Sequence, residues 1–290
     1  MLNQLIEQLQ TNVWFFYTVI IFLGLTVGSF LNVIIYRLPV MLDREWTQQC
    51  HDYLQHDATD TETRAEKFNL SYPPSTCPQC QHKIRAWENI PVISYIMLGG
   101  KCSHCKTPIS IQYPLVETVT AILSVFVAWH FGATAQTMAA LILTWSLVAL
   151  TMIDAQKQIL PDNITQPLLW LGIIVNIPEL FTSIESSVIG AIAGYLILWF
   201  IYHLFRILTG KEGMGYGDFK LLAVLGAWMG WEMLPLIIVL SSVVGAIIGI
   251  AMIVFRKHDK GVPIPFGPYL AIAGWIAFLW GPQITRAWLG

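Results

Sequence analysis

The sequence contains few charged residues for its length. Only 12% of its 290 residues are Asp, Glu, Lys or Arg, whereas 55% are hydrophobic, and the mean hydropathy is +0.59. Soluble domains contain about a quarter charged residues, so this composition excludes a cytosolic globular protein. The formal net charge of −2 lacks the basic excess of a nucleic-acid-binding protein. The composition therefore predicts a membrane protein that does not bind nucleic acid.

Lys and Arg are absent from five long stretches of the chain. These stretches are residues 1–36, 107–156, 158–205, 221–255 and 261–285. A membrane-spanning helix needs about 20 apolar residues, so the first and last stretches hold one span each and the others hold two. We therefore expect an all-α polytopic membrane protein with eight transmembrane helices. The expected spans are residues 13–36, 115–131, 136–154, 164–178, 187–208, 218–232, 234–255 and 267–284.

The basic residues also predict the orientation of these helices. All 16 Lys and Arg except Arg286 lie in or beside the loops that join odd-numbered to even-numbered spans. Such loops face the cytoplasm, so both termini are expected in the periplasm. The predicted organisation is a first transmembrane helix at 1–36, a cytoplasmic loop at 37–112 and a seven-helix membrane core at 113–290. In the first helix, Gly24 and Gly28 predict close packing against a neighbouring helix, and Ser29 and Asn32 predict hydrogen bonds to it.

Two Cys-x-x-Cys pairs stand in the long loop. Two thiolates on one tight turn can approach the same ion, and two such turns complete a tetrahedral zinc site. All four positions are then used for structure, so this zinc would not be catalytic. The predicted ligands are Cys77, Cys80, Cys102 and Cys105.

Other interpretations of this loop remain open. The four cysteines could form two disulfides, although disulfides seldom persist in a reducing cytoplasm. His82 or His104 could replace one thiolate, and Cys50 is interpreted as an incidental thiol. The acidic stretch 43–66 is typical of a solvated surface, and the alternative is that it attracts a basic peptide.

Two aspartates stand at the predicted cytoplasmic ends of membrane helices. Asp154 ends the third span and Asp218 begins the sixth, so the two carboxylates lie at one depth. Charged groups in membrane helices are costly and usually mark function. If the two face one another, they can share a proton and hydrolyse a peptide bond as an aspartic protease does. The alternatives are that Asp218 caps its helix and that Asp154 is an end residue, and Asp162 is expected to be a helix cap.

The combination of motifs in this chain resembles the type IV prepilin peptidases. The motifs are Gly28-Ser-Phe-Leu-Asn32 with Arg37-Leu-Pro39, the two cysteine pairs, Asp154 followed by Leu160-Pro-Asp162, Gly215-Tyr-Gly-Asp218-Phe-Lys220, and Pro263-Ile-Pro-Phe-Gly-Pro268. The resemblance covers nearly the whole chain. It implies a bifunctional aspartic protease and N-methyltransferase of the bacterial inner membrane, with Asp154 and Asp218 as the catalytic pair.

The resemblance also implies substrates and a cofactor. The substrates are type IV prepilins and type II secretion pseudopilins, which are cut after a glycine behind a short basic leader. The new N-terminal residue, usually phenylalanine, is then methylated with S-adenosylmethionine. Methyl-donor ligands are not assigned by this resemblance, and the polar or flexible positions near the cysteines are Trp87-Glu-Asn89, Gly99-Gly-Lys101 and Glu117.

Two other classes of protein share some of these features. A proton-coupled transporter would also carry acids in membrane helices, but it should have repeated halves with broken helices near the midplane. A non-enzymatic assembly scaffold could use the zinc loop to dock partners. Neither alternative explains the pair of boundary aspartates as directly as a peptidase does.

Overall fold

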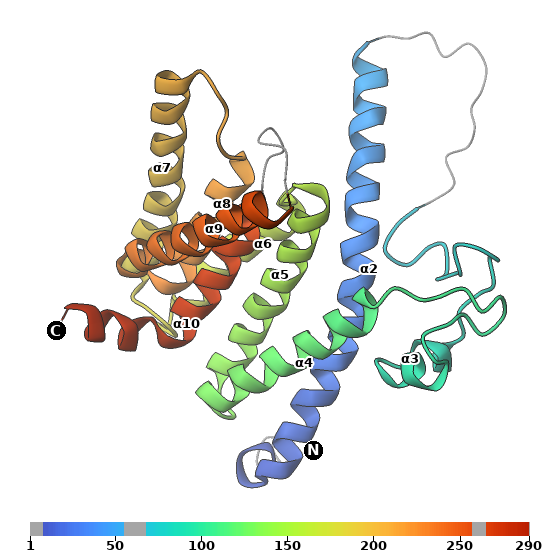
Figure 1. Ribbon diagram of the computed structural model, residues 1–290. Helices are drawn as coiled ribbons and strands as arrows, with labels where there is room; N and C mark the ends of the chain where they lie inside the picture. The colour runs from blue at the N-terminus through green and yellow to red at the C-terminus, as the bar shows by residue number, and fades with distance from the viewer. Residues whose placement is uncertain (1–7, 55–67, 257–264, 290) are drawn as a thin grey trace. The chain divides into compact units, whose positions relative to one another are not determined.

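A computed structural model describes residues 8–54, 68–256 and 265–289 of the chain. The elements described are helical, apart from two isolated β-bridges. The chain divides into two compact units, Met1–Ala128 (unit 1) and Trp129–Gly290 (unit 2). The elements (Figure 1) are α2 Val13–Tyr53, η1 Ala86–Asn89, α3 Ile93–Met97, α4 Gln112–Phe131, α5 Ala135–Lys157, α6 Asp162–Val175, α7 Ile184–Thr209, α8 Tyr216–Met229, η2 Trp231–Met233, α9 Leu234–Arg256 and α10 Gly267–Leu289.

Five helical segments in the described part of the chain are long and apolar enough to cross a membrane. They are α2, α4, α5, α7 and the segment Trp231–Ala251, which contains most of α9. Helices α6 and α8 have 14 residues each. They are therefore about 21 Å long, shorter than the roughly 30 Å hydrocarbon core of a bilayer. The all-helical class and the multi-pass character are confirmed, and the count of eight spans stays a prediction.

Helix α2 extends beyond the predicted end of the first span. It continues from Tyr36 through Pro39 to Tyr53. Its exposed second half has side-chain hydrogen bonds one turn apart, such as that from Gln48 Nε2 to Asp52 Oδ1 at 3.0 Å. Such pairs stabilise a helix in water. The acidic stretch therefore begins on this helix, and its later acids, Asp57, Asp60, Glu62 and Glu66, lie outside the described residues.

In unit 1, helices α2 and α4 pack closely through two glycines. A Cβ added at Gly24 would lie 2.7 Å from the Cα of Ala121, and one at Gly28 would lie 2.7 Å from the Cα of Glu117. Any side chain larger than hydrogen would push the two helices apart. The predicted packing role of these glycines is confirmed, and Asn32 Nδ2 adds a hydrogen bond of 3.1 Å to the carbonyl oxygen of Tyr113.

Helix α8 forms the centre of unit 2. Phe219 and every residue from Leu221 to Met229 are buried. The helix is surrounded because α6, α7 and α10 all contact it. A helix that is apolar on every side must be covered on every side, which explains why its sequence lacks a polar face.

A buried asparagine holds the C-terminal end of α8. Asn176 Nδ2 donates to the carbonyl oxygens of Ala227 and Trp228 at 3.0 and 3.2 Å. Its Oδ1 accepts from the backbone N–H groups of Phe181 and Thr182 at 3.0 and 3.2 Å. The last carbonyls of a helix have no partner inside the helix, and this side chain pairs with two of them. Ser187 Oγ also donates to the carbonyl oxygen of Ala227.

Helices α7 and α8 approach each other through their backbones. A Cβ at Gly190 would collide with the carbonyl oxygen of Gly226, and a Cβ at Gly226 would collide with that of Gly190. One helical turn away, a Cβ at Gly194 would lie 2.6 Å from the carbonyl oxygen of Leu222. The position of α8, and of the first turn that contains Asp218, therefore depends on glycine at these sites.

We expect Gly226→Ala to destabilise unit 2. The added methyl group has no space against Gly190, and overpacking of this kind costs about 1–3 kcal/mol. The apparent melting temperature in detergent should fall by roughly 5 °C. Ile192→Ala on α7 is the control, because Ile192 is exposed and its truncation adds no atoms to the contact. An unchanged melting temperature for Gly226→Ala would contradict the close approach of the two helices.

Candidate active site and metal centre

Asp154 lies in the last turn of α5 with its carboxylate buried in unit 2. The residue is only 5% exposed. Its carboxylate accepts a hydrogen bond from the backbone N–H of Gly267, at the start of α10. The other oxygen, Oδ2, is buried and has no hydrogen-bond partner among the described residues. One oxygen of this carboxylate is therefore held by a hydrogen bond, and the other is available to accept one.

Asp218 lies in the first turn of α8. It is 6% exposed, and its carboxylate accepts a hydrogen bond from the backbone N–H of Gly215. Gly215 is the N-cap residue, so Asp218 makes the returning half of a capping box rather than capping the helix itself. This bond holds the carboxylate at the positive end of the α8 dipole.

Leu160 and Gly267 link the surroundings of the two aspartates. A Cβ added at Gly217 would lie 2.8 Å from Leu160 Cβ. A Cβ added at Gly267 would lie 3.2 Å from Leu160 Cδ1. The same added Cβ at Gly267 would lie only 2.6 Å from Asp154 Oδ2. The carboxylates of Asp154 and Asp218 are also close enough for their charges to interact. The fold thus brings together the two aspartates that the sequence predicted as a pair.

Asp162 does not cap α6 as the sequence analysis expected. Pro161 occupies the cap position, and Asp162 is the first residue of the helix. Its carboxylate oxygens accept hydrogen bonds of 2.7 and 2.8 Å from Lys220 Nζ. The aspartate is paired because Lys220 reaches it from α8, two residues beyond Asp218. Sequence reasoning missed this ion pair, although both residues stand in the motifs that it quoted.

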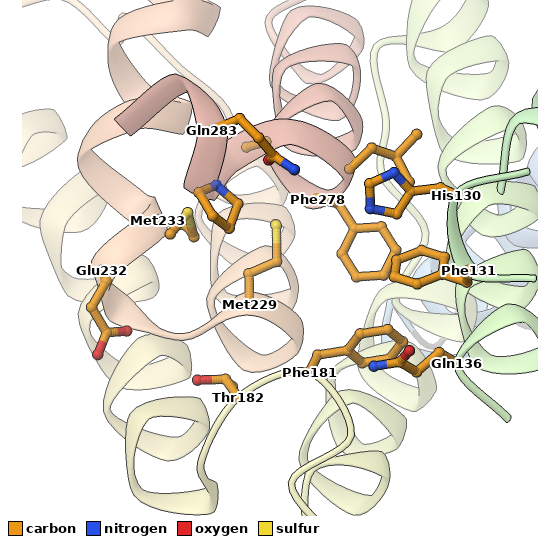
Figure 2. Close-up of a pocket in the computed structure, with 13 residues that line it drawn as sticks. His130, Phe131, Gln136, Phe181, Thr182, Met229, Glu232, Met233, Phe278 and Gln283 are labelled. Atoms are coloured by element: carbon orange, nitrogen blue, oxygen red, sulfur yellow. The ribbon is translucent and has the colours of Figure 1, made fainter. Parts of the chain in front are cut away.

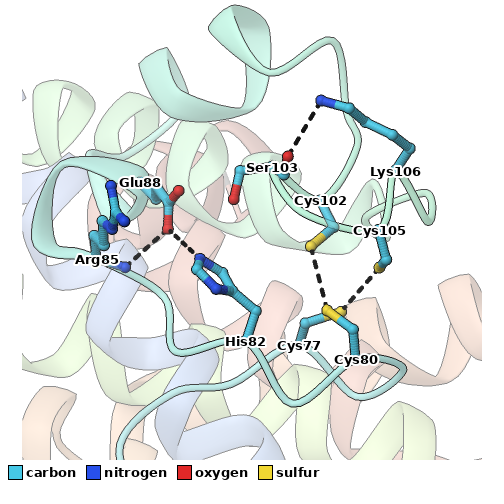
Figure 3. A network of polar contacts seen from close by, with 9 residues as sticks. All are labelled: Cys77, Cys80, His82, Arg85, Glu88, Cys102, Ser103, Cys105 and Lys106. Carbon is cyan, nitrogen blue, oxygen red and sulfur yellow. Dashed lines mark hydrogen bonds and ion pairs between the residues drawn. The ribbon is translucent and has the colours of Figure 1, made fainter.

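The four predicted cysteines gather into one cluster in unit 1. Their Sγ atoms all lie within 4.8 Å of one another. Cys77 Sγ is 3.7 Å from Cys105 Sγ, and Cys80 Sγ is 4.0 Å from Cys102 Sγ (Figure 3). Four sulfurs around a tetrahedral zinc ion at about 2.3 Å would be about 3.8 Å apart. The cysteines are free rather than disulfide-bonded, so the cluster could bind a metal ion.

The two cysteine pairs sit on matching backbone turns. Gln81 follows one pair and Lys106 the other, and both have a positive φ, 56° and 62°. Hydrogen bonds from Thr107 lower the pKa of Cys105 to about 6, and backbone hydrogen bonds from Cys80 and Gln79 lower the pKa of Cys77. These bonds favour the thiolate form of Cys77 and Cys105, and the thiolate is the form that binds metal. At Cys80 a backbone hydrogen bond from His82 acts in the same direction, but burial and the hydrogen bonds with the other cysteines outweigh it and raise its pKa to about 11.

The two nearby histidines do not join the cysteine cluster. His82 Nε2 lies 3.6 Å from Glu88 Oε2, and the His82 and His104 rings stack with centroids 5.5 Å apart. Glu88 also accepts from the backbone N–H of Arg85 at 2.9 Å, and this bond is the main cause of its lowered pKa. Of the alternatives, neither the disulfides nor a histidine ligand matches this arrangement.

Two further polar side chains in unit 1 hold the loop that follows α2. Arg37 is buried and donates to the carbonyl oxygens of Asn69 and Pro73 at 2.9 and 2.7 Å. Glu117 of α4 accepts from the backbone N–H of Val92 at 2.7 Å and from the side chain of Ser29. No role for Arg37 was predicted from the sequence, although a charged residue directly after an apolar run is a signal for a buried polar contact.

A pocket of about 380 Å³ lies at the other end of the unit 2 helices (Figure 2). Gln136 at the start of α5 lines it, whereas Asp154 is 18 residues further along that helix, or about 27 Å. Likewise Met229 at the end of α8 lines the pocket, and Asp218 is at the beginning. The pocket is therefore separate from the aspartate pair.

Comparison with known proteins identifies the two halves of the chain. Residues 22–131 match the bacterial peptidase A24 N-terminal domain, and residues 141–250 match the type IV leader peptidase family. A prepilin leader peptidase/N-methyltransferase from Stutzerimonas stutzeri is 56% identical over 98% of this chain and 97% of its own length.

Proteins of the same description from two other bacteria agree. The one from Pseudomonas aeruginosa is 58% identical over 93% of this chain and 92% of its own length. The one from Legionella pneumophila is 45% identical over 96% of each chain. No solved structure matches the chain. With both halves matched and such identity over nearly its full length, the chain belongs to the type IV leader peptidase family.

Proposed function

We propose that this chain is a prepilin leader peptidase and N-methyltransferase. It removes the basic leader of type IV prepilins and type II secretion pseudopilins by cutting after a glycine. It then methylates the new N-terminal residue, usually phenylalanine. The relatives described above support the two reactions by their names. The observation that carries the peptidase assignment is the pair of buried, interacting carboxylates of Asp154 and Asp218.

The two aspartates can divide the chemistry of hydrolysis between them. An ionised carboxylate takes a proton from water, which attacks the peptide carbonyl carbon, while a protonated carboxyl polarises the carbonyl oxygen. No covalent intermediate with the protein is formed. Asp154 Oδ2 has an open acceptor, whereas the bonds to Gly267 and Gly215 keep the carboxylates from rotating freely.

The proposed location matches the place where such a substrate presents its scissile bond. The chain crosses the bacterial inner membrane eight times, with loop 37–112 in the cytoplasm and both termini in the periplasm. A prepilin held by its apolar helix has its leader in the cytoplasm, so the bond to be cut lies at the inner membrane surface. The distribution of Lys and Arg supports this orientation and, with it, a position of Asp154 and Asp218 at the same surface.

The cysteine cluster is proposed to hold a structural zinc ion. Cys77, Cys80, Cys102 and Cys105 would be its ligands, and the sulfur separations support this geometry. The ion would cross-link the two turns of a loop that has little apolar core of its own. S-adenosylmethionine would supply the methyl group. The part of the chain that the structure describes contains no strand–turn–helix nucleotide motif, so a helical framework would bind the donor.

We expect Asp154→Asn and Asp218→Asn each to lower leader cleavage by about 10²- to 10⁴-fold, because an amide neither accepts nor donates the catalytic proton. Asp162→Asn is the matched control, since it removes a nearby carboxylate that pairs with Lys220. Cleavage is measured by mass spectrometry of a purified prepilin. Near-normal cleavage by either variant at 154 or 218 would overturn the catalytic assignment.

The zinc assignment predicts a stoichiometric metal in the purified protein. Cys77→Ser should reduce zinc to a small fraction of the wild-type amount, because three thiolates and an alcohol hold the ion poorly. Cys50→Ser should leave the zinc content unchanged, since Cys50 is exposed and outside the cluster. Elemental analysis of both variants gives the answer, and equal zinc in the two would refute the assignment.

The zinc loop should matter more for methylation than for cleavage. In Cys77→Ser we expect the fraction of cleaved product that is methylated to fall by roughly tenfold. The assay incubates the variant with prepilin, with and without S-adenosylmethionine, and measures the mass of one added CH₂ group. Normal methylation by the zinc-free variant would contradict a role of the zinc loop in methylation. An unchanged prepilin with wild-type protein would instead favour a transporter or a scaffold.

A further inference from the structure

Residues 90–98, which we call the apolar segment, expose large hydrophobic side chains. The segment reads Ile-Pro-Val-Ile-Ser-Tyr-Ile-Met-Leu and contains no charged residue. Ile93 is 54% exposed, Ile96 is 71% exposed and Met97 is 77% exposed, all on the short helix α3. Contiguous apolar exposure of this kind is rare on a water-facing surface and marks an interaction site.

A hydrogen bond holds the apolar segment next to the helices that enter the membrane. The backbone N–H of Val92 donates to Glu117 Oε2 at 2.7 Å. Glu117 is buried near the start of α4, where it also bonds Ser29 of α2. Val92 has a φ of 58°, which a β-branched residue seldom adopts, so the chain turns sharply there before α3 begins. The exposed side chains therefore start at the point where two apolar helices leave the loop.

The exposed charges that flank the segment in the sequence are of one sign. Between residues 68 and 111, the four exposed charged side chains are Lys83, Arg85, Lys101 and Lys106. The one acid in this range, Glu88, has a side chain that is only 6% exposed and is paired with His82. Basic groups next to membrane helices are attracted to anionic lipid headgroups.

We propose that the apolar segment is a membrane-surface site that inserts into the bilayer among anionic phospholipids. Ile93, Ile96 and Met97 would enter the boundary between headgroups and acyl chains, while the four basic side chains contact the phosphates. The bilayer is the occupant that fits best, because the segment is tied to Glu117 at the end of a membrane helix. Because the cysteine cluster is in the same loop, insertion of the apolar segment would hold the cluster at the membrane surface.

Photo-crosslinking of the full chain tests this site. The photoreactive residue p-benzoylphenylalanine is introduced at position 96 in place of Ile, and at the exposed control position Gln79, which lies inside the first cysteine pair. Each variant is reconstituted in vesicles of phosphatidylethanolamine and phosphatidylglycerol and illuminated. We expect at least tenfold more phospholipid adduct at position 96 than at position 79, measured by mass spectrometry of the peptides.

Other products at position 96 would overturn the proposal. A crosslink to a second copy of the chain, or to residues 129–290 of the same chain, in place of lipid would identify a protein contact. Equal lipid labelling at positions 96 and 79 would show that any exposed position near a vesicle is labelled, so the apolar segment would have no special contact with the bilayer. Zinc content and helical circular dichroism establish that each variant is folded, so a missing adduct counts against the site.

The role of charge is tested separately. Replacing the four basic residues by Gln should reduce the adduct at position 96 severalfold in vesicles with phosphatidylglycerol. In phosphatidylcholine vesicles the same replacement should have little effect, because the attraction requires anionic lipid. An equal loss in both kinds of vesicle, or no loss in either, would contradict the assignment of anionic phospholipid. None of these measurements depends on peptidase or methyltransferase activity.

Discussion

The backbone contact between α7 and α8 is the interaction on which unit 2 depends. Gly190 and Gly226 let two helices approach until their backbones touch, and this permits α8 to be covered by neighbours on all sides. Because α8 is apolar all around, it has no stable position except at the centre. Its only acid, Asp218, is in the first turn, where the chain comes out of a glycine-rich loop. The packing that stabilises the unit therefore also fixes the place of one carboxylate.

The second carboxylate, that of Asp154, is positioned by contacts between other helices. Asp154 ends α5 and accepts a hydrogen bond from the N–H at the beginning of α10, and its charge interacts with that of Asp218 on α8. Three helices that are distant in sequence therefore converge there. Gly267 allows this approach since a side chain at that position would reach Asp154 Oδ2. The ion pair of Asp162 and Lys220 joins the N-terminal parts of α6 and α8. Both side chains are partly exposed to solvent, so the pair contributes little stability.

In unit 1, the described part of the loop between α2 and α4 has few buried apolar residues and is ordered by polar contacts. Arg37 and Glu117 bind backbone atoms of the loop from positions on α2 and α4. The cysteine cluster brings together the turn before η1 and the turn after α3. The hydrogen bonds of Arg37 and Glu117 thus order a segment that is too small to form an apolar core of its own.

The sequence by itself determined the class of the protein, the candidate aspartates and the cysteine pairs. Hydropathy, charge spacing and the Cys-x-x-Cys spacing are local properties, so they can be read without knowing which helices touch. Only the tertiary structure decided that Gly267 binds Asp154, that Lys220 pairs with Asp162, and that Glu117 holds Val92. It also decided that α2 runs on to Tyr53 and that neither histidine belongs to the cluster. These outcomes depend on how each helix is rotated about its axis and on which backbone groups are left unpaired, and both are fixed by packing between distant segments.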